Sequence, residues 1–274
     1  MSNGAYCHSV MFFIPAPDKP KNMNKTVFIT GATAGFGEAC ARKFAANSYN
    51  VIITGRRRDR LEQLAAELTR TFSVAVLPLA FDVRNREQVL KMIGSLEEPW
   101  KQIDVLVNNA GLAVGKDRFD QASLDDWDTM VDTNLKGFAY VAQAVAKRMI
   151  PHKRGHIINL GSVAAKQVYA QGNMYCATKH AVEALSQAMR IDLLPYHIKV
   201  TAIHPGAADT EFSTVRFKGD RIAAEKVYDG LIPLVAADVA ETIFYCTTLP
   251  EHVCINDLVI TCTQQADCFY DHRE

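Results

Sequence analysis

Short runs of β-branched and other apolar residues recur along most of the chain, and longer stretches with helical spacing of apolar residues separate most of these runs. A short continuous apolar run is typical of a strand buried on both faces, whereas spacing of three to four residues is typical of a helix. The predicted strands are residues 26–30, 51–54, 74–79, 103–107, 156–160, 199–203 and 257–261. The predicted helices are residues 38–47, 58–70, 87–96, 124–149, 174–194 and 235–249.

This alternation predicts an α/β fold class, because each crossover between parallel strands is right-handed and covers one face of the sheet. We therefore expect a doubly wound parallel seven-stranded sheet with helices on both faces, formed by one domain over residues 25–274. Residues 1–24 lack periodicity and are predicted to be a disordered N-terminal extension. The alternation lapses between Ile203 and Val235, which predicts a lid over an active site.

Composition excludes several classes of function. The 274 residues include 30 Lys or Arg and 30 Asp or Glu, so no global field favours nucleic acid or an anionic membrane. The apolar run from Val10 to Ile14 is too short to span a membrane. Seven cysteines without a Cys-x-x-Cys pair are typical of reduced thiols in a cytoplasmic protein. Pro151 and Gly155 make the stretch between His152 and His156 a predicted loop, so we expect no metal site there. The expected partner is a small-molecule substrate.

A glycine-rich turn joins the first predicted strand to the first predicted helix. The turn contains Gly31, Thr33, Gly35, Phe36 and Gly37. Glycines in such a turn let backbone N–H groups approach a pyrophosphate at the positive N-terminus of the helix. Because a strand precedes the turn and a helix follows it, we interpret it as a dinucleotide-binding site, which makes the expected fold Rossmann-type.

The end of the second predicted strand indicates which dinucleotide is bound. An acidic residue at this position would hold the ribose 2′-hydroxyl of NAD, but the chain has Arg56 and Arg57 there. Guanidinium groups bind phosphate bidentately, so the pattern predicts NADP as the cofactor. Asp82 and Val83 end the third strand. The Asp82 carboxylate there either accepts a hydrogen bond from the adenine amino group or has an ordinary structural role in the turn.

Three residues form a predicted catalytic group. Tyr175 and Lys179 are four positions apart in a predicted helix, so both side chains project from one face. A nearby ammonium, together with a positive nicotinamide, would lower the pKa of the tyrosine and make its phenolate accessible as a base. Ser162 follows the end of a strand, where its hydroxyl can donate to the substrate oxygen. Lys179 can also hold the hydroxyls of the nicotinamide ribose.

These motifs together resemble the short-chain dehydrogenase/reductase family. The glycine turn, Asn108-Asn109-Ala110-Gly111, Asn134, Ser162, Tyr175-x-x-x-Lys179 and Pro205-Gly206 occur in the family's order. The chain is similar in more detail to the NADP-dependent 3-hydroxy-acid dehydrogenases, which also oxidise serine and L-allo-threonine. The stretches that carry this closer likeness are residues 30–38, 54–57, 81–86, 104–112, 127–134, 211–220 and 249–253. The resemblance implies an oxidoreductase that moves a hydride between NADP and a small 3-hydroxy acid or its keto or semialdehyde form.

The resemblance also implies roles for residues that the pattern alone does not assign. Asn134 would support a water that relays protons to Lys179, and Asn109 would lie against the adenosine. Pro205, Gly206 and Thr210 would flank the nicotinamide amide. Members of the family commonly pair two long helices across a two-fold axis, here residues 124–149 and 174–194, so a homotetramer is expected.

The residues expected to bind the substrate carboxylate are predicted from their charge or hydrogen-bonding groups. A carboxylate must meet a cation or an amide, since burying it unpaired costs several kcal/mol. Beside Ser162, the candidates are the cations Arg216 and Lys166, in that order, the hydroxyl of Tyr169, and the amides Gln171 and Asn173. His204 replaces an acidic residue of the similar dehydrogenases, and we interpret it as structural.

Two other functions are compatible with these motifs. A reductase of 3-ketoacyl groups on an acyl carrier would use the same chemistry and would present a basic helix, which we find only around Arg56–Arg60. A non-catalytic NADP-binding sensor would typically lack the tyrosine or the lysine, both of which are present here.

Overall fold

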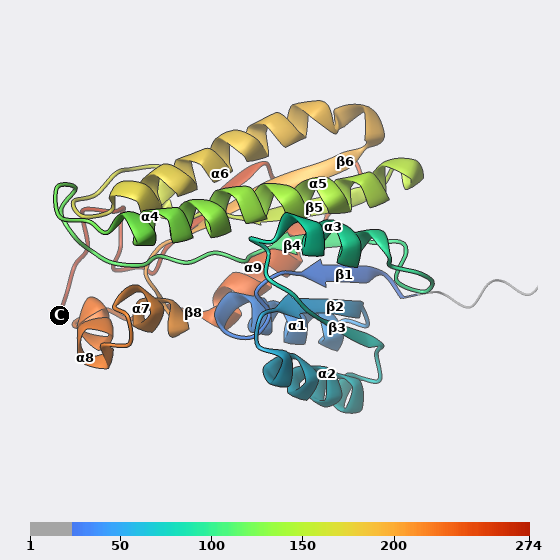
Figure 1. Ribbon diagram of the computed structural model, residues 1–274, viewed down its shortest axis with the longest axis horizontal. Coiled ribbons are helices and arrows are strands. Elements are labelled where there is room, and N and C mark those ends of the chain that lie inside the picture. The colour runs from blue at the N-terminus through green and yellow to red at the C-terminus, as the bar shows by residue number, and fades with distance from the viewer. Residues whose placement is uncertain (1–23) are drawn as a thin grey trace, which may run out of the picture.

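The computed structural model describes residues 24–274, so the predicted N-terminal extension lies outside the described residues, apart from Asn24. A seven-stranded sheet in the order β3-β2-β1-β4-β5-β6-β9 forms the centre, and every neighbouring pair is parallel (Figure 1). The strands are β1 (Thr26–Ile29), β2 (Asn50–Gly55), β3 (Val76–Ala80), β4 (Val105–Asn108), β5 (Gly155–Leu160), β6 (Ile198–Pro205) and β9 (Asp257–Ile260). The predicted fold class is confirmed.

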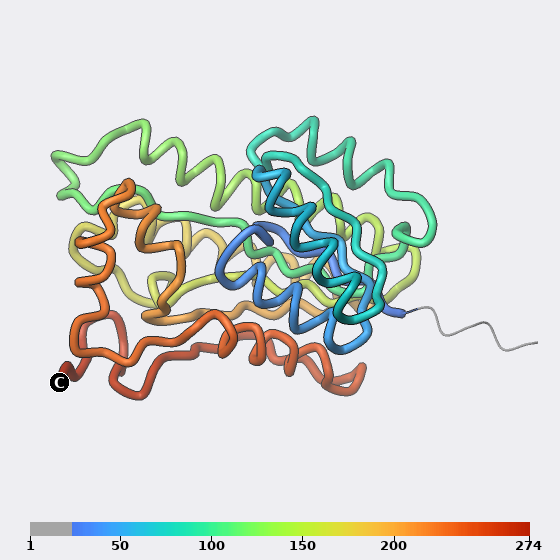
Figure 2. The backbone as a smooth tube through the Cα atoms, turned by 90° about the horizontal axis from the view of Figure 1, so that it is seen from below, coloured from blue at the N-terminus to red at the C-terminus, as the bar shows by residue number. Residues whose placement is uncertain are grey.

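Helices cover both faces of the sheet, as Figures 1 and 2 show. One face packs against α1 (Gly35–Ala46), α2 (Arg58–Phe72) and α9 (Ala236–Thr248). The other face packs against α3 (Arg86–Gly94), α5 (Phe138–Met149) and α6 (Asn173–Asp192). Each layer buries an apolar cluster, which is why the central strands consist almost wholly of buried residues.

The strand order reverses between β1 and β4. The chain runs outward from β1 through β2 to β3, and then returns to the other side of β1 to form β4. The loops after β1 and β4 therefore diverge, and the crevice between them at the carboxyl ends of the strands is where such sheets bind ligands.

Two regions differ from the pattern-based prediction. The helix expected over residues 124–149 is interrupted: α4 (Leu124–Val131) is followed by a π-helical segment, η1 (Asp132–Gly137), before α5. The predicted lid contains two short helices, α7 (Glu211–Arg216) and α8 (Arg221–Glu225), beside a two-stranded sheet of β7 (Ala208–Asp209) and β8 (Leu234–Val235). Figures 1 and 2 show α7 and α8 beyond the carboxyl ends of the central strands, near the C-terminus.

No helix among residues 24–274 combines the length and the apolar character that crossing a membrane requires.

Candidate active site

The three residues of the predicted catalytic group lie together at the carboxyl end of β5. Tyr175 and Lys179 share one face of α6, and both are buried, as is Ser162. Lys179 Nζ donates to Leu160 O at 2.8 Å and lies 5.9 Å from the centre of the Tyr175 ring. Ser162 caps a short 3₁₀ turn, and its Oγ accepts from the N–H of Ala164 at 3.1 Å.

Burial dominates the protonation of this group. Burial raises the pKa of Tyr175, and the nearby Tyr169 raises it further, whereas a hydrogen bond with Ser162 and the charge of Arg216 lower it. Burial also lowers the pKa of Lys179 from 10.5 to about 8. In the protein alone, Arg216 is the cation that lowers the pKa of Tyr175, and the effect of Lys179 together with a bound nicotinamide stays a prediction.

Asn134 lies in the π-helical segment η1 and is buried. Its side chain accepts from Leu112 N at 2.8 Å, and donates to Leu112 O at 2.7 Å and to Thr178 Oγ1 at 3.2 Å. These bonds connect the loop after β4 to α6, one residue before Lys179. The amide is thus committed to protein groups, which leaves the backbone of Asn134 for the predicted contact with a water.

The glycine turn after β1 forms the floor of a pocket at the crevice. Gly31 and Gly35 have φ values of 67° and 54°, a left-handed conformation that favours glycine. A Cβ on Gly37 would lie 2.3 Å from Gly31 O, so this glycine lets α1 begin directly against the turn. The side chain of Asn109 donates to Thr30 O at 2.8 Å and thereby holds the loop after β4 to the loop after β1.

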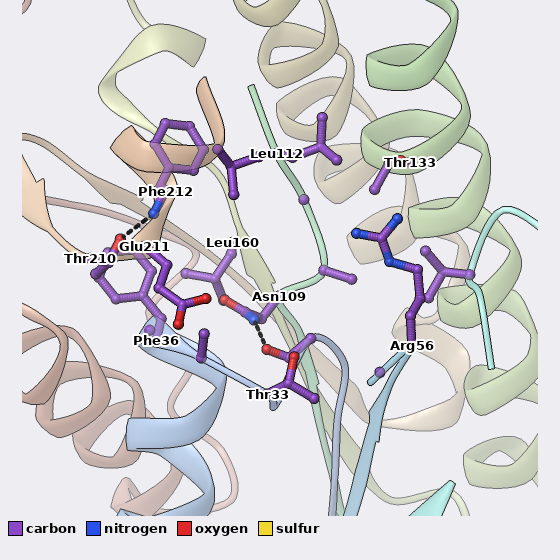
Figure 3. A pocket seen from close by; sticks show the side chains of 18 of the residues that line it. Thr33, Phe36, Arg56, Asn109, Leu112, Thr133, Leu160, Thr210, Glu211 and Phe212 are labelled. Carbon is purple, nitrogen blue, oxygen red and sulfur yellow. Dashed lines mark hydrogen bonds between the residues drawn. The ribbon is translucent and has the colours of Figure 1, made fainter. Parts of the chain in front are cut away.

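Arginines surround the pocket where β2 ends. Arg56 lines the pocket and makes no side-chain hydrogen bond or ion pair with the described residues (Figure 3). Arg57 donates to Thr33 Oγ1 at 2.8 Å and pairs with Glu211 of α7 at 3.0 Å. Glu211 also pairs with Arg60 at 2.8 Å, so the lid is attached to the basic end of β2.

Asp82 also lines this pocket, in the loop after β3. Its carboxylate accepts from Arg84 Nη2 at 2.7 Å and from Arg84 Nε at 2.9 Å. The pKa of Asp82 is lowered: the Arg84 hydrogen bonds outweigh the opposing effect of partial burial. Both interpretations of Asp82 remain open, because a carboxylate has about four lone-pair sites and the bonds to Arg84 leave some of them free.

The predicted cofactor residues divide between two pockets. The crevice pocket is lined by Gly31, Thr33, Gly35, Phe36, Arg56, Arg57, Asp82, Val83, Asn109, Tyr175, Lys179 and Thr210. Pro205 and Gly206 line the adjoining pocket under the lid instead, and Gly37 lies behind the turn. Tyr175 and Phe36 line both pockets, so the two spaces meet at the hydroxyl-bearing ring of Tyr175.

Ser162 and Arg216 line the pocket under the lid, as predicted for substrate-binding residues. Arg216 donates to Tyr169 Oη at 3.0 Å, and its Cζ lies 5.5 Å from the Tyr169 ring and 5.7 Å from the Tyr175 ring. Its Nε is buried and has no hydrogen-bond partner among the described residues. A guanidinium that lines the pocket beside the predicted acid/base is suited to an anionic group.

Gln171 and Lys166 do not reach this pocket, and their predicted roles are corrected here. Gln171 has a φ of 64° in the loop before α6, is exposed, and lines neither pocket. Lys166 turns away to pair with Asp257. The side chain of Asn173 accepts from Trp127 Nε1 at 3.1 Å and is likewise outside both pockets.

Sequence reasoning missed six polar residues that line the lid pocket, namely Lys116, Ser213, Tyr228, Gln265, Asp271 and Arg273. One of the cations, Arg273, pairs with Asp271 at 2.8 Å. Burial lowers the pKa of Lys116, followed by the charges of Arg216 and Arg273, which shows that three cations converge there. Lys116 directly follows Gly115 in the loop after β4. Ser213 and Tyr228 belong to the lid, and Gln265, Asp271 and Arg273 lie in the last part of the chain. No local motif marks any of them, because only the fold brings them to Ser162.

Comparisons with known proteins agree with this geometry. Residues 25–220 match the family model described as short chain dehydrogenase. The NADP-dependent 3-hydroxy acid dehydrogenase YdfG of Escherichia coli strain K12 is 46% identical over 250 residues, which cover 90% of this chain and 99% of that relative. Sulfoacetaldehyde reductase 2 of Chromohalobacter salexigens is 44% identical over 245 residues, which cover 89% of this chain and 96% of that relative.

A solved structure shows the same likeness in three dimensions. The closed form of a serine dehydrogenase complexed with NADP⁺ is similar to this chain with a TM-score of 0.85 and 45% sequence identity. The match covers 91% of this chain and 100% of that one. The family model, the relatives and the fold all agree, and the chain belongs to the short-chain dehydrogenase family.

Proposed function

We propose that this protein is an NADP-dependent dehydrogenase of small 3-hydroxy acids, such as serine, L-allo-threonine or 3-hydroxypropionate, or a reductase of their keto or semialdehyde forms. The observation that carries the proposal is the position of Tyr175. This residue lies where the crevice pocket meets the lid pocket, with Lys179 on the crevice side and Ser162 and Arg216 on the lid side. The relatives' names support the substrate class.

The crevice pocket fits NADP. The glycine turn presents the N-terminus of α1 for a pyrophosphate, and Arg56 and Arg57 line the pocket where a 2′-phosphate would need cations. Asn109 and Val83 would contact the adenosine, while Thr210, Pro205 and Gly206 would contact the nicotinamide end. When bound, the cofactor supplies the nicotinamide carbon that accepts or donates the hydride.

The chain's own residues would handle the proton and orient the substrate. Ser162 Oγ would donate to the substrate oxygen and hold it beside Tyr175. Tyr175 Oη would take the hydroxyl proton during oxidation and return it during reduction. Lys179 would hold the ribose hydroxyls and, with its pKa near 8, exchange a proton close to working pH. Arg216 would bind the carboxylate.

A second substrate class is favoured by one comparison. The relative named sulfoacetaldehyde reductase 2 acts on a small aldehyde whose anionic group is a sulfonate. Arg216 and the neighbouring cations of the lid pocket would bind a sulfonate as they would a carboxylate.

An absorbance screen at 340 nm tests the proposal. Purified protein would be mixed with NADP or NAD and a panel containing serine, L-allo-threonine, 3-hydroxypropionate and 2-hydroxyethanesulfonate. We expect turnover with NADP and at least one 3-hydroxy acid. In a parallel assay with NADPH, turnover of a bulky 3-ketoacyl thioester alone would identify a 3-ketoacyl reductase. NADP binding without turnover in either direction would identify a non-catalytic sensor.

We also propose that the protein is a cytoplasmic homotetramer. All six cysteines among the described residues carry free thiols, as is usual in a reducing compartment. The helices α4, α5 and α6 lie side by side on one face of the molecule (Figure 1). Large apolar side chains are exposed near their ends, namely Leu124, Ile191 and Leu194, at 68%, 73% and 71%. A second copy would cover them.

A further inference from the structure

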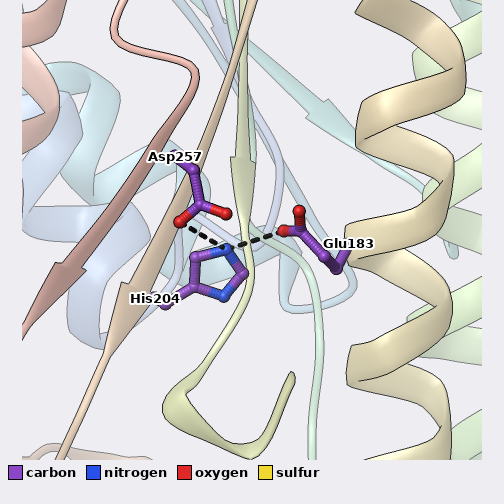
Figure 4. Close-up of side chains that lie close together, drawn as sticks. All are labelled: Glu183, His204 and Asp257. Atoms are coloured by element: carbon purple, nitrogen blue, oxygen red, sulfur yellow. Dashed lines mark ion pairs between the residues drawn. The ribbon is translucent and has the colours of Figure 1, made fainter. Parts of the chain in front are cut away.

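His204 lies behind the loop that carries Ser162 and is fully buried, with no exposed side-chain surface. Its Nε2 lies 2.9 Å from Glu183 Oε2 and 3.7 Å from Asp257 Oδ1 (Figure 4), close contacts whose angles do not make hydrogen bonds with the ring as it is placed. Its Nδ1 lies 3.3 Å from Ser162 N and 3.1 Å from Ser162 O. The imidazole therefore connects a pair of acidic residues to the backbone of the residue predicted to hold the substrate.

Lys166 supplies the positive charge of this cluster. Its ammonium pairs with Asp257 and lies 3.6 Å from Glu183 Oε2. The ligating atoms of Glu183, His204 and Asp257 lie within 4.8 Å of one another, a spacing that a metal ion would also accept. Because the Lys166 ammonium already lies between the two carboxylates, it balances their charge, and the cluster needs no metal ion. The role of the His204 imidazole is then a separate question.

Charge and burial fix which tautomer the imidazole adopts. Burial lowers the pKa of His204, followed by the charge of Lys166, and these effects exceed the opposing ones of Ser162, Asp257 and Glu183. The ring is therefore neutral at neutral pH, with one N–H to place. Two carboxylates on the Nε2 side attract that hydrogen, so Nε2 carries it and Nδ1 keeps a lone pair.

The tautomer decides which atom of Ser162 the ring can bind. A lone pair on Nδ1 accepts from the Ser162 N–H, whereas a protonated Nδ1 would donate to the Ser162 carbonyl oxygen instead. One nitrogen cannot do both, so protonation of the ring would release the N–H and engage the carbonyl. Gain or loss of one proton would thus exchange the backbone partner at a residue that touches the substrate.

The packing leaves the loop no room to move independently of the ring. A Cβ on Gly161 would lie 2.4 Å from His204 Nδ1, so the ring lies directly against the Gly161 backbone. The N–H of Gly161 donates to Ile203 O at 2.7 Å, which fixes the preceding peptide, between Leu160 and Gly161. A change at His204 is therefore transmitted to the backbone of Ser162, whose side chain lines the lid pocket.

We propose that His204 is a positioning residue for Ser162: oriented by Glu183 and Asp257, its neutral imidazole accepts the Ser162 N–H and holds the hydroxyl at the substrate. This role rests on the proposed function, because it assumes that Ser162 binds the reacting oxygen. It revises the interpretation of His204 as merely structural.

Two isosteric substitutions separate the two nitrogens of the ring. In His204→Asn the amide oxygen takes the place of Nδ1 and can still accept the Ser162 N–H, whereas in His204→Gln the amide reaches the Nε2 position and leaves that N–H without an acceptor. With NADPH and 3-oxopropionate, we expect kcat of the Asn variant to stay within about threefold of wild type and kcat of the Gln variant to fall about tenfold or more.

Urea midpoints and NADPH affinity serve as controls for folding and for the cofactor site, and both variants should keep the wild-type NADPH affinity. Equal losses of kcat in the two variants, or no loss in either, would overturn the proposal. Wild-type protein without turnover would instead overturn the proposed function, so the two failures are distinguishable.

The pH profile gives a readout that simple packing would not change. In the reductive direction Tyr175 must be protonated, so its own titration does not lower the rate on the acid side. We expect wild-type kcat to fall below pH 6.5 as His204 gains its proton, and the Asn variant to lack this fall.

The variant Lys166→Met removes a cation that lowers the His204 pKa, so the fall should move about half a pH unit or more upward. An acid fall that persists in His204→Asn, or that does not move in Lys166→Met, would contradict the proposal.

Discussion

Arg216 packs between two tyrosine rings in the lid pocket and keeps its Nε without a partner among the described residues. If the guanidinium meets the substrate anion, Arg216→Ala should raise KM for serine or 3-hydroxypropionate by about tenfold or more, since a hydrogen bond to a charged group contributes about 1.5–3 kcal/mol. Steady-state kinetics would compare these acids with 1,3-propanediol, which is similar in size and uncharged.

Lys218→Ala is the matched control for that measurement. Lys218 lies two residues further along the lid and pairs with Asp126 at 2.8 Å, with its side chain 58% exposed. Its loss should leave KM for the acids close to wild type. If Arg216→Ala raises KM equally for the acids and for the diol, Arg216 shapes the lid and does not bind the anion of the substrate.

At the scale of elements, the turn from β2 into α2 determines the choice of cofactor. The double variant Arg56→Ala, Arg57→Ala should lose the preference for NADP, which we expect to be about tenfold or more in kcat/KM over NAD, because the 2′-phosphate loses its charged partners. Rates with both cofactors measured at 340 nm check this. Arg58→Ala is the control, since Arg58 starts the same helix but lies 3.8 Å from Glu62 and outside the pocket. A double variant that keeps the preference would contradict the assignment.

The elements also show where sequence patterns stop being informative. Seven strands and most helices were predictable, because burial on both faces and helical spacing leave clear patterns. The π-helical segment around Asn134 was not, since it inserts one residue into a helix whose apolar spacing continues on either side. The lid helices α7 and α8 are too short to show a period.

Side-chain partners were less predictable than elements. The motif identified Tyr175, Lys179 and Ser162, but for the carboxylate the sequence offered both Arg216 and Lys166, with Arg216 preferred. Only the fold shows that Asp257 of β9 binds one of them and that two tyrosine rings hold the other beside the pocket. His204 looked structural for the same reason: its partners come from α6 and β9, far away in sequence.

At the scale of the whole molecule, the expected assembly is testable. Light scattering at micromolar concentration should give about four times the 30.3 kDa mass of the chain. A double variant Ile191→Lys, Leu194→Lys places charges among the exposed apolar residues at the end of α6 and should reduce that mass. A monomer mass for the wild-type protein would refute the tetramer.

The proposed mechanism depends on Tyr175 transferring the proton that accompanies the hydride, and Tyr175→Phe measures this most directly. The substitution removes only the Oη, so the NADP dissociation constant should stay within about threefold of wild type while kcat for the oxidation of a 3-hydroxy acid falls by about 10² or more. Turnover above about a tenth of wild type, with NADP still bound, would show that another group moves the proton and would contradict the proposed mechanism.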